Sequence, residues 1–330
     1  LEFRRVLFRS NVTHGDLYGY LRDDRLNAPN ALSATTLPMS QKQYGGSLGG
    51  PISRNRTFYF ANVEDRRLNQ SGLTTIPAAS VATINARLAA IGYPGALVST
   101  GVFANPVHST NVLGKIDHRV SAADSLTLRY SEYDAASANS RGAGGTAAPS
   151  ASAGLDNVDR AVSVANVWNL SPRTVNETRA QFAYGNLQAL PSDTVGPAVS
   201  IAGLATFGTL SGSPQGRVNR LYEVVDNVSH QAGAHAVRVG ADFLLNDDTI
   251  MFPGSNRGSY TFSSLANFLS GTYNNAGFTQ TFGTFAVSQN NPNLGLYAQD
   301  EWKATPSLTI NAGLRYDLQW LRSINTDTNN

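Results

Sequence analysis

Cysteine is absent from this 330-residue sequence, which excludes disulfide scaffolds and thiolate metal sites. A basic excess is also missing, because 25 Lys and Arg stand against 23 Asp and Glu, and nucleic-acid-binding proteins depend on such an excess. No stretch approaches the roughly 18 uninterrupted apolar residues of a membrane-spanning helix. If the chain crosses a membrane, it must do so as a closed β-barrel, which satisfies every backbone polar group without helices.

The first ten residues, LEFRRVLFRS, look like an in-frame translation of a common short-read sequencing adapter. A basic membrane-targeting start is the alternative. We exclude residues 1–10 as adapter-derived and expect the natural chain to begin mid-gene near Asn11. Without Arg4, Arg5, Arg9 and Glu2, the sequence carries 22 basic and 22 acidic residues and has no net charge.

Residues 308–320, LTINAGLRYDLQW, alternate strictly between apolar and polar side chains. A period of two predicts a β-strand, whose successive side chains point to opposite faces. The run is longer than the five or six residues of an average soluble strand and matches the roughly nine to eleven that cross a bilayer at a tilt. One face would then contact lipid, and the other would line a wet lumen.

Other segments repeat this pattern in pairs that are joined by short turns, and each pair predicts a β-hairpin. The pairs are residues 112–120 with 125–133, 161–170 with 175–184, 221–230 with 235–244, and 294–302 with 308–320. The long connections between hairpins, such as residues 135–157 and 190–217, are rich in Gly, Ser and Pro and offer little that could form a core. Short turns alternating with long loops are typical of an outer-membrane barrel, with periplasmic turns and extracellular loops.

Two short helices are expected within these loops. Residues 80–92 begin at a capping Ser80 and end at Gly92, and residues 263–271 have a similar pattern.

A basic side chain on the lipid face near the membrane midplane costs about 2 to 4 kcal/mol, so charged residues should share the lumen-facing positions. The candidates for the lumen face are Glu177, Arg179, Arg238, Asp242, Arg315 and Asp317. We expect them to pair with one another and with a plug. Asp226 is a misfit, because it falls on the apolar side in mid-strand, and a β-bulge could rescue it.

The sequence gives little support to an enzyme. The Gly-rich stretches YGGSLGG and RGAGGTAAPS lack the GK[ST] ending of a phosphate loop. The five His residues show no metal-ligand spacing. We expect no catalytic residues, no metal and no cofactor.

Two stretches resemble the TonB-dependent receptors, in particular their Oar-like β-barrel group. The first runs from THGDLYGYLRDDRLNA through KQYGGSLGGPISRNRTFYFANVEDRR, and the second is LGLYAQDEWKATPSLTINAGLRYD. The residues that carry this resemblance are Gly45, Gly46, Gly49, Gly50, Pro51, Tyr297, Asp300, Trp302, Gly313, Arg315 and Tyr316. The glycines would remove side chains where strands curve or where a plug lies against the wall.

The resemblance implies a transporter in the outer membrane of a Gram-negative type of cell, with a barrel of about twenty-two strands closed by an N-terminal plug. Its expected partners are the TonB energy-transducing complex, reached through the plug, a lipid and lipopolysaccharide bilayer, and an unknown extracellular ligand, with no nucleic acid. About a dozen strands can be counted here. Residues 11–330 are therefore expected to be the N-terminal half of the barrel, with the signal peptide and plug missing upstream and further strands missing downstream.

A secreted soluble β-sandwich, such as an adhesin or a carbohydrate-binding protein, is the alternative from a different class. Its apolar faces would form a buried core.

Overall fold

The computed structural model describes residues 10–29, 35–274 and 277–320, so nearly all of the adapter-like start and the last ten residues lie outside the described part. Its largest feature is one antiparallel sheet of 12 strands, which confirms the predicted all-β fold. In chain order the strands are β1 (His14–Asp23), β2 (Met39–Ser53), β3 (Thr57–Thr74), β4 (Gly101–Ala104), β5 (Val107–Arg119), β6 (Asp124–Arg141), β7 (Ala153–Ser171), β8 (Thr174–Ala189), β11 (Gln215–Ala232), β12 (His235–Met251), β15 (Ala286–Thr305) and β16 (Leu308–Gln319).

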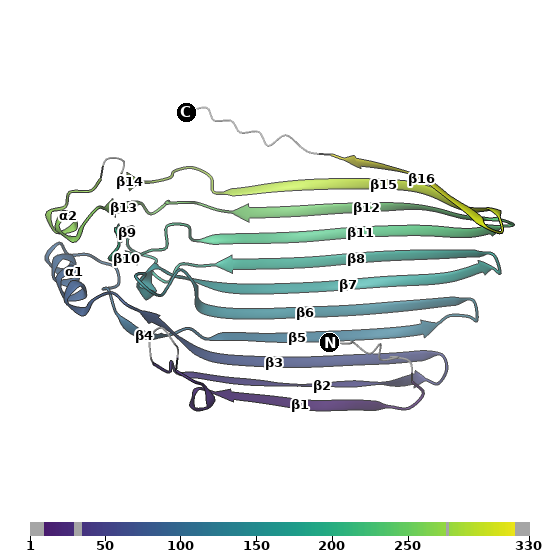
Figure 1. Cartoon of the computed structure of the whole chain (residues 1–330), viewed down its shortest axis with the longest axis horizontal. Helices are drawn as coiled ribbons and strands as arrows, with labels where there is room; N and C mark the ends of the chain where they lie inside the picture. Colours follow the sequence, from purple (N-terminus) through teal and green to yellow (C-terminus); the bar gives the residue numbers. More distant parts are fainter. Residues whose placement is uncertain (1–9, 30–34, 275–276, 321–330) are drawn as a thin grey trace.

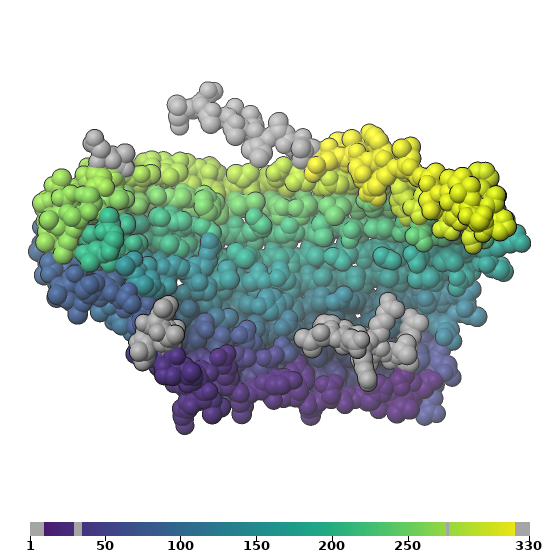
Figure 2. All heavy atoms as spheres, viewed as in Figure 1, coloured from purple at the N-terminus to yellow at the C-terminus, as the bar shows by residue number. Residues whose placement is uncertain are grey.

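Each strand of this sheet is hydrogen-bonded to the next one in that series, except that β4 pairs only with β3, and β3 pairs directly with β5. Figure 1 shows the resulting order from purple β1 to yellow β16. In Figure 2 the side chains of neighbouring strands pack into one continuous wall. The four hairpins predicted from the sequence are all present, as β5–β6, β7–β8, β11–β12 and β15–β16.

The two ends of the sheet differ, as the sequence predicted. Tight turns close one end, among them residues 54–56, which contain Arg54 and Arg56, and residues 233–234. The described parts of the long connections lie at the opposite end, where Figure 1 shows the helices and the short strands. The longest strands contain 18 to 20 residues, about twice what a bilayer requires. Strands of this length would extend beyond a bilayer on the side of the long loops.

The long loops fold together at that end into what we call the loop-end assembly. It contains α1 (Ala78–Ala90), the 3-10 turn η2 (Pro149–Ala151), β9 (Ala198–Ile201), β10 (Ala205–Gly208), β13 (Ser259–Phe262), α2 (Leu265–Ser270) and β14 (Phe278–Thr279). Another 3-10 turn, η1 (Asp24–Leu26), follows β1. The strands form a second sheet in the order β10-β9-β13-β14. Its core is made of Ile76, Ile84, Leu88, Val98, Ala148, Val199, Ile201, Ala205, Phe207, Phe262 and Phe268.

This assembly corrects the expectation that residues 135–157 and 190–217 could form little core. Strands β6 and β7 continue into the first segment, and Ala148 and Ala151 are buried there. The second segment supplies β9 and β10, and Phe207 is fully buried. Small side chains pack closely once loops from different hairpins meet, and composition within one loop does not reveal those partners.

The two helices were predicted with unequal accuracy. The helix α2 is capped by Ser264, which accepts a hydrogen bond from the backbone of Asn267, and it ends at Gly271 in the left-handed conformation, as glycine favours. The prediction that Ser80 caps α1 is wrong, because the N-cap is Pro77, whose carbonyl accepts the first helical hydrogen bond from Val81. Among the described residues, no helix is long and apolar enough to cross a membrane.

The register gives the sheet two chemically distinct faces, because residues paired across antiparallel strands point to the same side. What we call the apolar face carries Leu17, Leu48, Val63, Ile116, Leu128, Val164, Phe182, Val224, Phe243, Leu296 and Leu314. The alternate positions form the polar face. Leu17 is 93% exposed and Leu314 79%, and no second sheet among the described residues covers them. A sandwich core would bury these side chains, so the soluble β-sandwich does not fit.

Charged residues return to the apolar face toward the loop end. Glu132 of β6 pairs with Arg160 of β7 at 3.0 Å, and Arg220 of β11 pairs with Asp247 of β12 at 3.5 Å. Between these pairs and the tight turns, the face forms a mostly apolar band, as expected of a membrane barrel. The band is interrupted at Asp226, which accepts hydrogen bonds from Thr178 and Asn176. The pairings of β11 run without a register shift, so the β-bulge that could have turned Asp226 away is absent.

Candidate functional site

All six charged candidates lie on the polar face. Glu177 and Arg179 project from β8, and Arg238 and Asp242 project from β12. Arg315 and Asp317 project from β16. Their common side follows from strand pairing, since Asp242 is paired with Gly295, and Gly295 with Asp317. The structure thus brings charges from separate hairpins onto one wall.

Arg315 is the centre of the most complete ion-pair group on this wall. Its Nη2 lies 2.9 Å from Asp242 Oδ2 on β12 and 2.6 Å from Asp317 Oδ1 on its own strand. The guanidinium therefore links β16 to β12 across the whole width of β15. Two carboxylates around one guanidinium form a group of charge-assisted hydrogen bonds.

The other candidates are less closely joined. Arg179 Nη2 lies 3.7 Å from Glu177 Oε2 on the same strand. Arg238 Nε donates to Ser229 Oγ at 3.1 Å and forms no ion pair with another described residue. The charges therefore form local groups along the wall instead of one continuous ladder.

Glycines on the polar face make room for contacts that cross a strand. Gly295 lies between Asp242 and Asp317, and an added Cβ there would overlap Arg315 and Asp242. Gly240 does the same on β12, where Tyr297 Oη donates to Asn227 Oδ1 at 2.6 Å. In each case a long side chain passes over the glycine to the second strand along.

The motif residue Gly45 has the same role near the start of the sheet. Tyr18 of β1 donates to Glu64 Oε2 of β3 at 2.6 Å, and an added Cβ on Gly45 would lie 2.6 Å from the Tyr18 hydroxyl. The sequence showed the glycines, but not which side chains cross them, because that depends on the register between strands.

The other motif residues of β2 and β16 are divided between the two faces of the sheet. Pro51 lies at a register shift in β2, which fits a residue that has no N–H for the ladder. The glycines Gly46 and Gly50 lie on the apolar face, and Gly49 and Gly313 on the polar one.

The motif residues Trp302, Asp300 and Tyr316 lie on the apolar face. Asp300 is held there by His235, whose Nδ1 lies 2.6 Å from Asp300 Oδ2. The His235 ring also stacks on Trp302 with centroids 5.5 Å apart. Sequence analysis missed this pairing, since the two residues belong to different hairpins.

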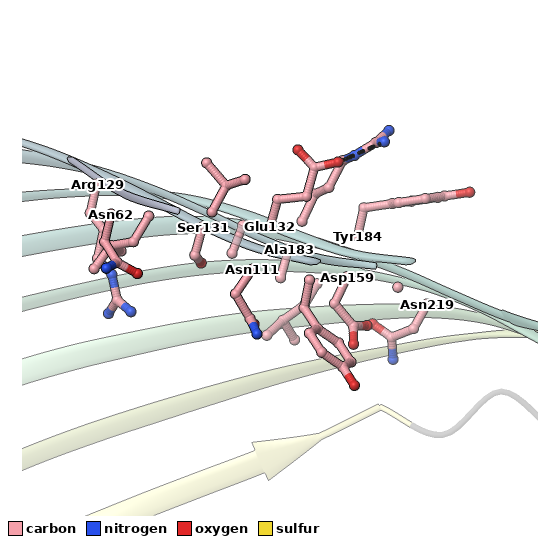
Figure 3. Close-up of a pocket in the computed structure, with 16 residues that line it drawn as sticks. Asn62, Asn111, Arg129, Ser131, Glu132, Asp159, Ala183, Tyr184 and Asn219 are labelled. Atoms are coloured by element: carbon pink, nitrogen blue, oxygen red, sulfur yellow. Dashed lines mark hydrogen bonds and ion pairs between the residues drawn. The ribbon is translucent and has the colours of Figure 1, made fainter. Parts of the chain in front are cut away.

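A depression of about 410 Å³ lies over the central strands toward the loop end. Figure 3 shows Asn62, Asn111, Arg129, Asp159 and Asn219 projecting on one side of the sheet, and Glu132 and Tyr184 on the other. The first group belongs to the polar face, and its amide groups are the side chains that sequence analysis overlooked.

Hydrogen bonds extend this amide-rich surface to β12. Asn219 Nδ2 donates to Asn246 Oδ1 at 2.8 Å and to Asp248 Oδ1 at 2.7 Å. The polar face therefore carries ion pairs nearer the turns and amides nearer the loops. No group of three or more acidic or His side chains that could hold a metal ion occurs within the described ranges.

Comparison with known proteins agrees with this architecture. A family model described as an outer membrane beta barrel domain matches residues 10–92 and 94–330. The sequence matches no curated protein. The fold is similar to that of the outer membrane transporter YddB from Escherichia coli, with a TM-score of 0.56 and 12% identity over 86% of this chain and 34% of that one.

Two receptors show a comparable likeness. The siderophore receptor PirA from Acinetobacter baumannii gives a TM-score of 0.55 and 13% identity, with coverage of 94% and 39% of the two chains. A mutant of the ferric enterobactin receptor PfeA from Pseudomonas aeruginosa gives a TM-score of 0.54 and 11% identity, and the match covers 94% of this chain and 40% of that one. The chain thus spans between a third and two fifths of these three proteins. The predicted resemblance to TonB-dependent receptors is confirmed at the level of the fold, and the Oar-like subgroup stays a prediction.

Proposed function

Because the chain belongs to the outer membrane beta barrel domain family, we propose that it forms the first half of the wall of a plugged, TonB-energised transporter. In this proposal a large ligand binds on the extracellular side, TonB remodels the plug, and the ligand passes along the polar face. Residues 11–330 would follow a signal peptide and plug and precede the remaining strands.

The observation that carries the proposal is the continuous polar face behind an exposed apolar face. The outer surface suits lipid, while the inner one offers hydrogen-bonding and charged groups along its whole height. Fixed charges such as Arg315 with Asp242 and Asp317 give the wall places where a plug can dock and release, because ion pairs near water exchange partners at little net cost.

Conductance of the full-length protein in planar lipid bilayers tests the proposal. We expect the intact protein to be closed, and a variant that keeps the signal peptide but lacks the plug between it and Asn11 to conduct ions through a large pore. Cells that express the shortened variant should also admit vancomycin, which the intact outer membrane excludes. An intact protein that conducts as well as the shortened one would show a passive porin and contradict the proposal.

A lumen variant supplies a second readout. If Arg315, Asp242 and Asp317 line the pore, Arg315→Ala should shift the ion selectivity of the shortened protein toward cations. The control Leu314→Ala changes the neighbouring residue, which lies on the apolar face, and should leave selectivity unchanged.

A further inference from the structure

Amide side chains gather on the polar face toward the loop end. Two neighbouring rows of cross-strand partners contain them, and they come from β3, β5, β11, β12 and β15. Arg220, which follows Asn219 in the sequence, forms one of the ion pairs that border the apolar band, so these rows lie where a ligand that enters from the loops arrives first. We call the amides of the two rows the amide surface, which consists of Asn62, Asn111, Asn219, Asn246, Gln289 and Asn291.

Hydrogen bonds within the amide surface orient its side chains and still leave groups free. Asn219 Nδ2 donates to Asn246 Oδ1 and to Asp248 Oδ1, and Gln289 Nε2 donates to Asn291 Oδ1 at 2.9 Å. The side-chain oxygen of Asn219 and both side-chain N–H groups of Asn291 have no partner among the described residues. The surface therefore presents both acceptors and donors in fixed positions.

The depression over the central strands lies between the two halves of the amide surface. Its floor contains the small residues Ala161, Ala183 and Gly185. Asn111, which projects on this side in Figure 3, and the hydroxyl group of Tyr133 line it and make no hydrogen bond with another described residue. An amide group and a hydroxyl group each combine donor and acceptor capacity, so the depression favours a ligand whose own groups do both.

The charges around the amide surface do not favour an anionic ligand. The two rows contain no Lys or Arg, and their carboxylates are those of Asp16, Glu64, Asp159 and Asp248. The rows on either side add the charged residues Arg66, Lys115, Arg129, Arg217 and Glu223. Acidic and basic groups are therefore nearly balanced, and attraction of a negative ligand needs an excess of positive charge.

We infer that the amide surface binds a neutral oligosaccharide. Each sugar hydroxyl group donates and accepts hydrogen bonds, as the amides and Tyr133 do, and a neutral ligand is not repelled by the carboxylates. The seven steps from β3 to β15, at about 4.8 Å each, span about 34 Å along the wall, so an elongated chain of sugars can contact several amides at once. The inference rests on the proposed transport function, since it names the class of ligand that the transporter would carry.

Calorimetric titration of the intact full-length protein in detergent micelles tests the inference. The probes are the neutral sugars maltohexaose, cellohexaose and xylohexaose, with the anionic sugar hexagalacturonate and the anionic complex ferric enterobactin as controls. We expect at least one neutral sugar to bind, and both anions to bind at least tenfold more weakly. An anion that binds as tightly as the best neutral sugar would overturn the inference. Absence of binding by all three neutral sugars, which is also the result if the plug covers the amide surface, would overturn it as well.

One pair of variants assigns the binding to this surface. Asn111→Leu removes an amide without breaking a hydrogen bond inside the chain, and it should weaken sugar binding about tenfold. Asn311→Leu is the matched control, because Asn311 is an exposed amide of the polar face near the turns, and it should bind as the parent does. Equal affinity of the two variants would overturn the assignment.

Heat-modifiable migration verifies that both variants form barrels. Binding in micelles requires neither an open pore nor TonB, whereas planar-bilayer conductance tests the gated pore without any sugar. Failure of the inference is therefore distinguishable from failure of the proposed function.

Discussion

Single glycines decide which side chains meet on the polar face. Gly45, Gly240 and Gly295 each lie under a side chain that reaches from one neighbouring strand to the other. In each case the space above the glycine is occupied by a hydroxyphenyl or guanidinium group. The side chains that cross these glycines therefore connect three strands, whereas an ordinary cross-strand pair connects two.

Gly295→Ala tests this role. The new Cβ would displace Arg315 and separate it from Asp242, and we expect a loss of about 1 to 3 kcal/mol, typical of overpacking. The measurement is the urea concentration at the midpoint of unfolding, with the folded fraction monitored by heat-modifiable migration. Gly114→Ala is the control, because nothing lies within 4 Å of its added Cβ. In an Arg315→Ala background the cost of Gly295→Ala should largely vanish, and a cost that persisted would show that Arg315 is not its cause.

At the scale of elements, the loop-end assembly has a core of its own, separate from the sheet. Phe207 of β10 is fully buried and meets Phe268 of α2 edge to face, with ring centroids 5.7 Å apart. Segments from four different hairpin connections meet around this pair. The loop end of the wall is therefore a folded unit, and its stability can be altered without changing the barrel.

Phe207→Ala should unfold this unit selectively, because truncating a buried Phe costs about 3 to 5 kcal/mol. We expect residues 190–214 to become sensitive to protease added to intact cells, while heat-modifiable migration of the barrel is unchanged. Phe282→Ala is the control, since Phe282 is 80% exposed. Equal protease sensitivity in both variants would argue against the shared core.

Tyr93, which follows α1, gives the loop-end assembly a dependence on high pH. Burial, together with the carboxylate of Asp193, raises the pKa of Tyr93 to about 12. A raised pKa means that the folded state holds the proton more tightly, so this contribution to stability is complete below pH 10 and is lost as pH rises from about 10 to about 12. The difference between the absorbance titration curves of the parent protein and of Tyr93→Phe should show one tyrosine that ionises near pH 12. A midpoint near pH 10 in this difference would contradict the expectation.

At the scale of the whole molecule, the two faces of one sheet meet different surroundings. The apolar face is exposed over the length of the band, while the polar face collects Arg315, Asp242 and the amides around Asn219. A lipid-facing band excludes charged side chains, because moving a charge from water into lipid costs free energy. The same substitution should thus have a large cost at one position and a small cost at the next.

Phe243→Arg and Leu244→Arg compare the two faces directly. Phe243 lies on the apolar face, and arginine there should cost about 2 to 4 kcal/mol of folding into a bilayer. Leu244 is paired with Glu223 and Asn293 on the polar face, where arginine finds partners and should cost less than about 1 kcal/mol. Folding yield into lipid vesicles measures both, and equal yields would mean that the faces are wrongly assigned.

The sequence by itself determined the strands, the hairpins and the side on which each residue lies. Alternation in residues 308–320 is a local property, because a side-chain period of two follows from the pleat of a single strand. Turn length is equally local, so the division into short turns and long loops can be read directly from the order of the residues. Arg315, Asp242 and Glu177 could therefore be placed on one face from their positions alone.

Only the tertiary structure decided which of those residues touch. Arg315 reaches Asp242 over Gly295, and Asp226 gathers Thr178 and Asn176, because the register brings together strands far apart in the chain. The core around Phe207 likewise joins loops that look featureless one at a time. Such contacts depend on the distances between separate segments, and the local pattern of one segment carries no information about its partner's register.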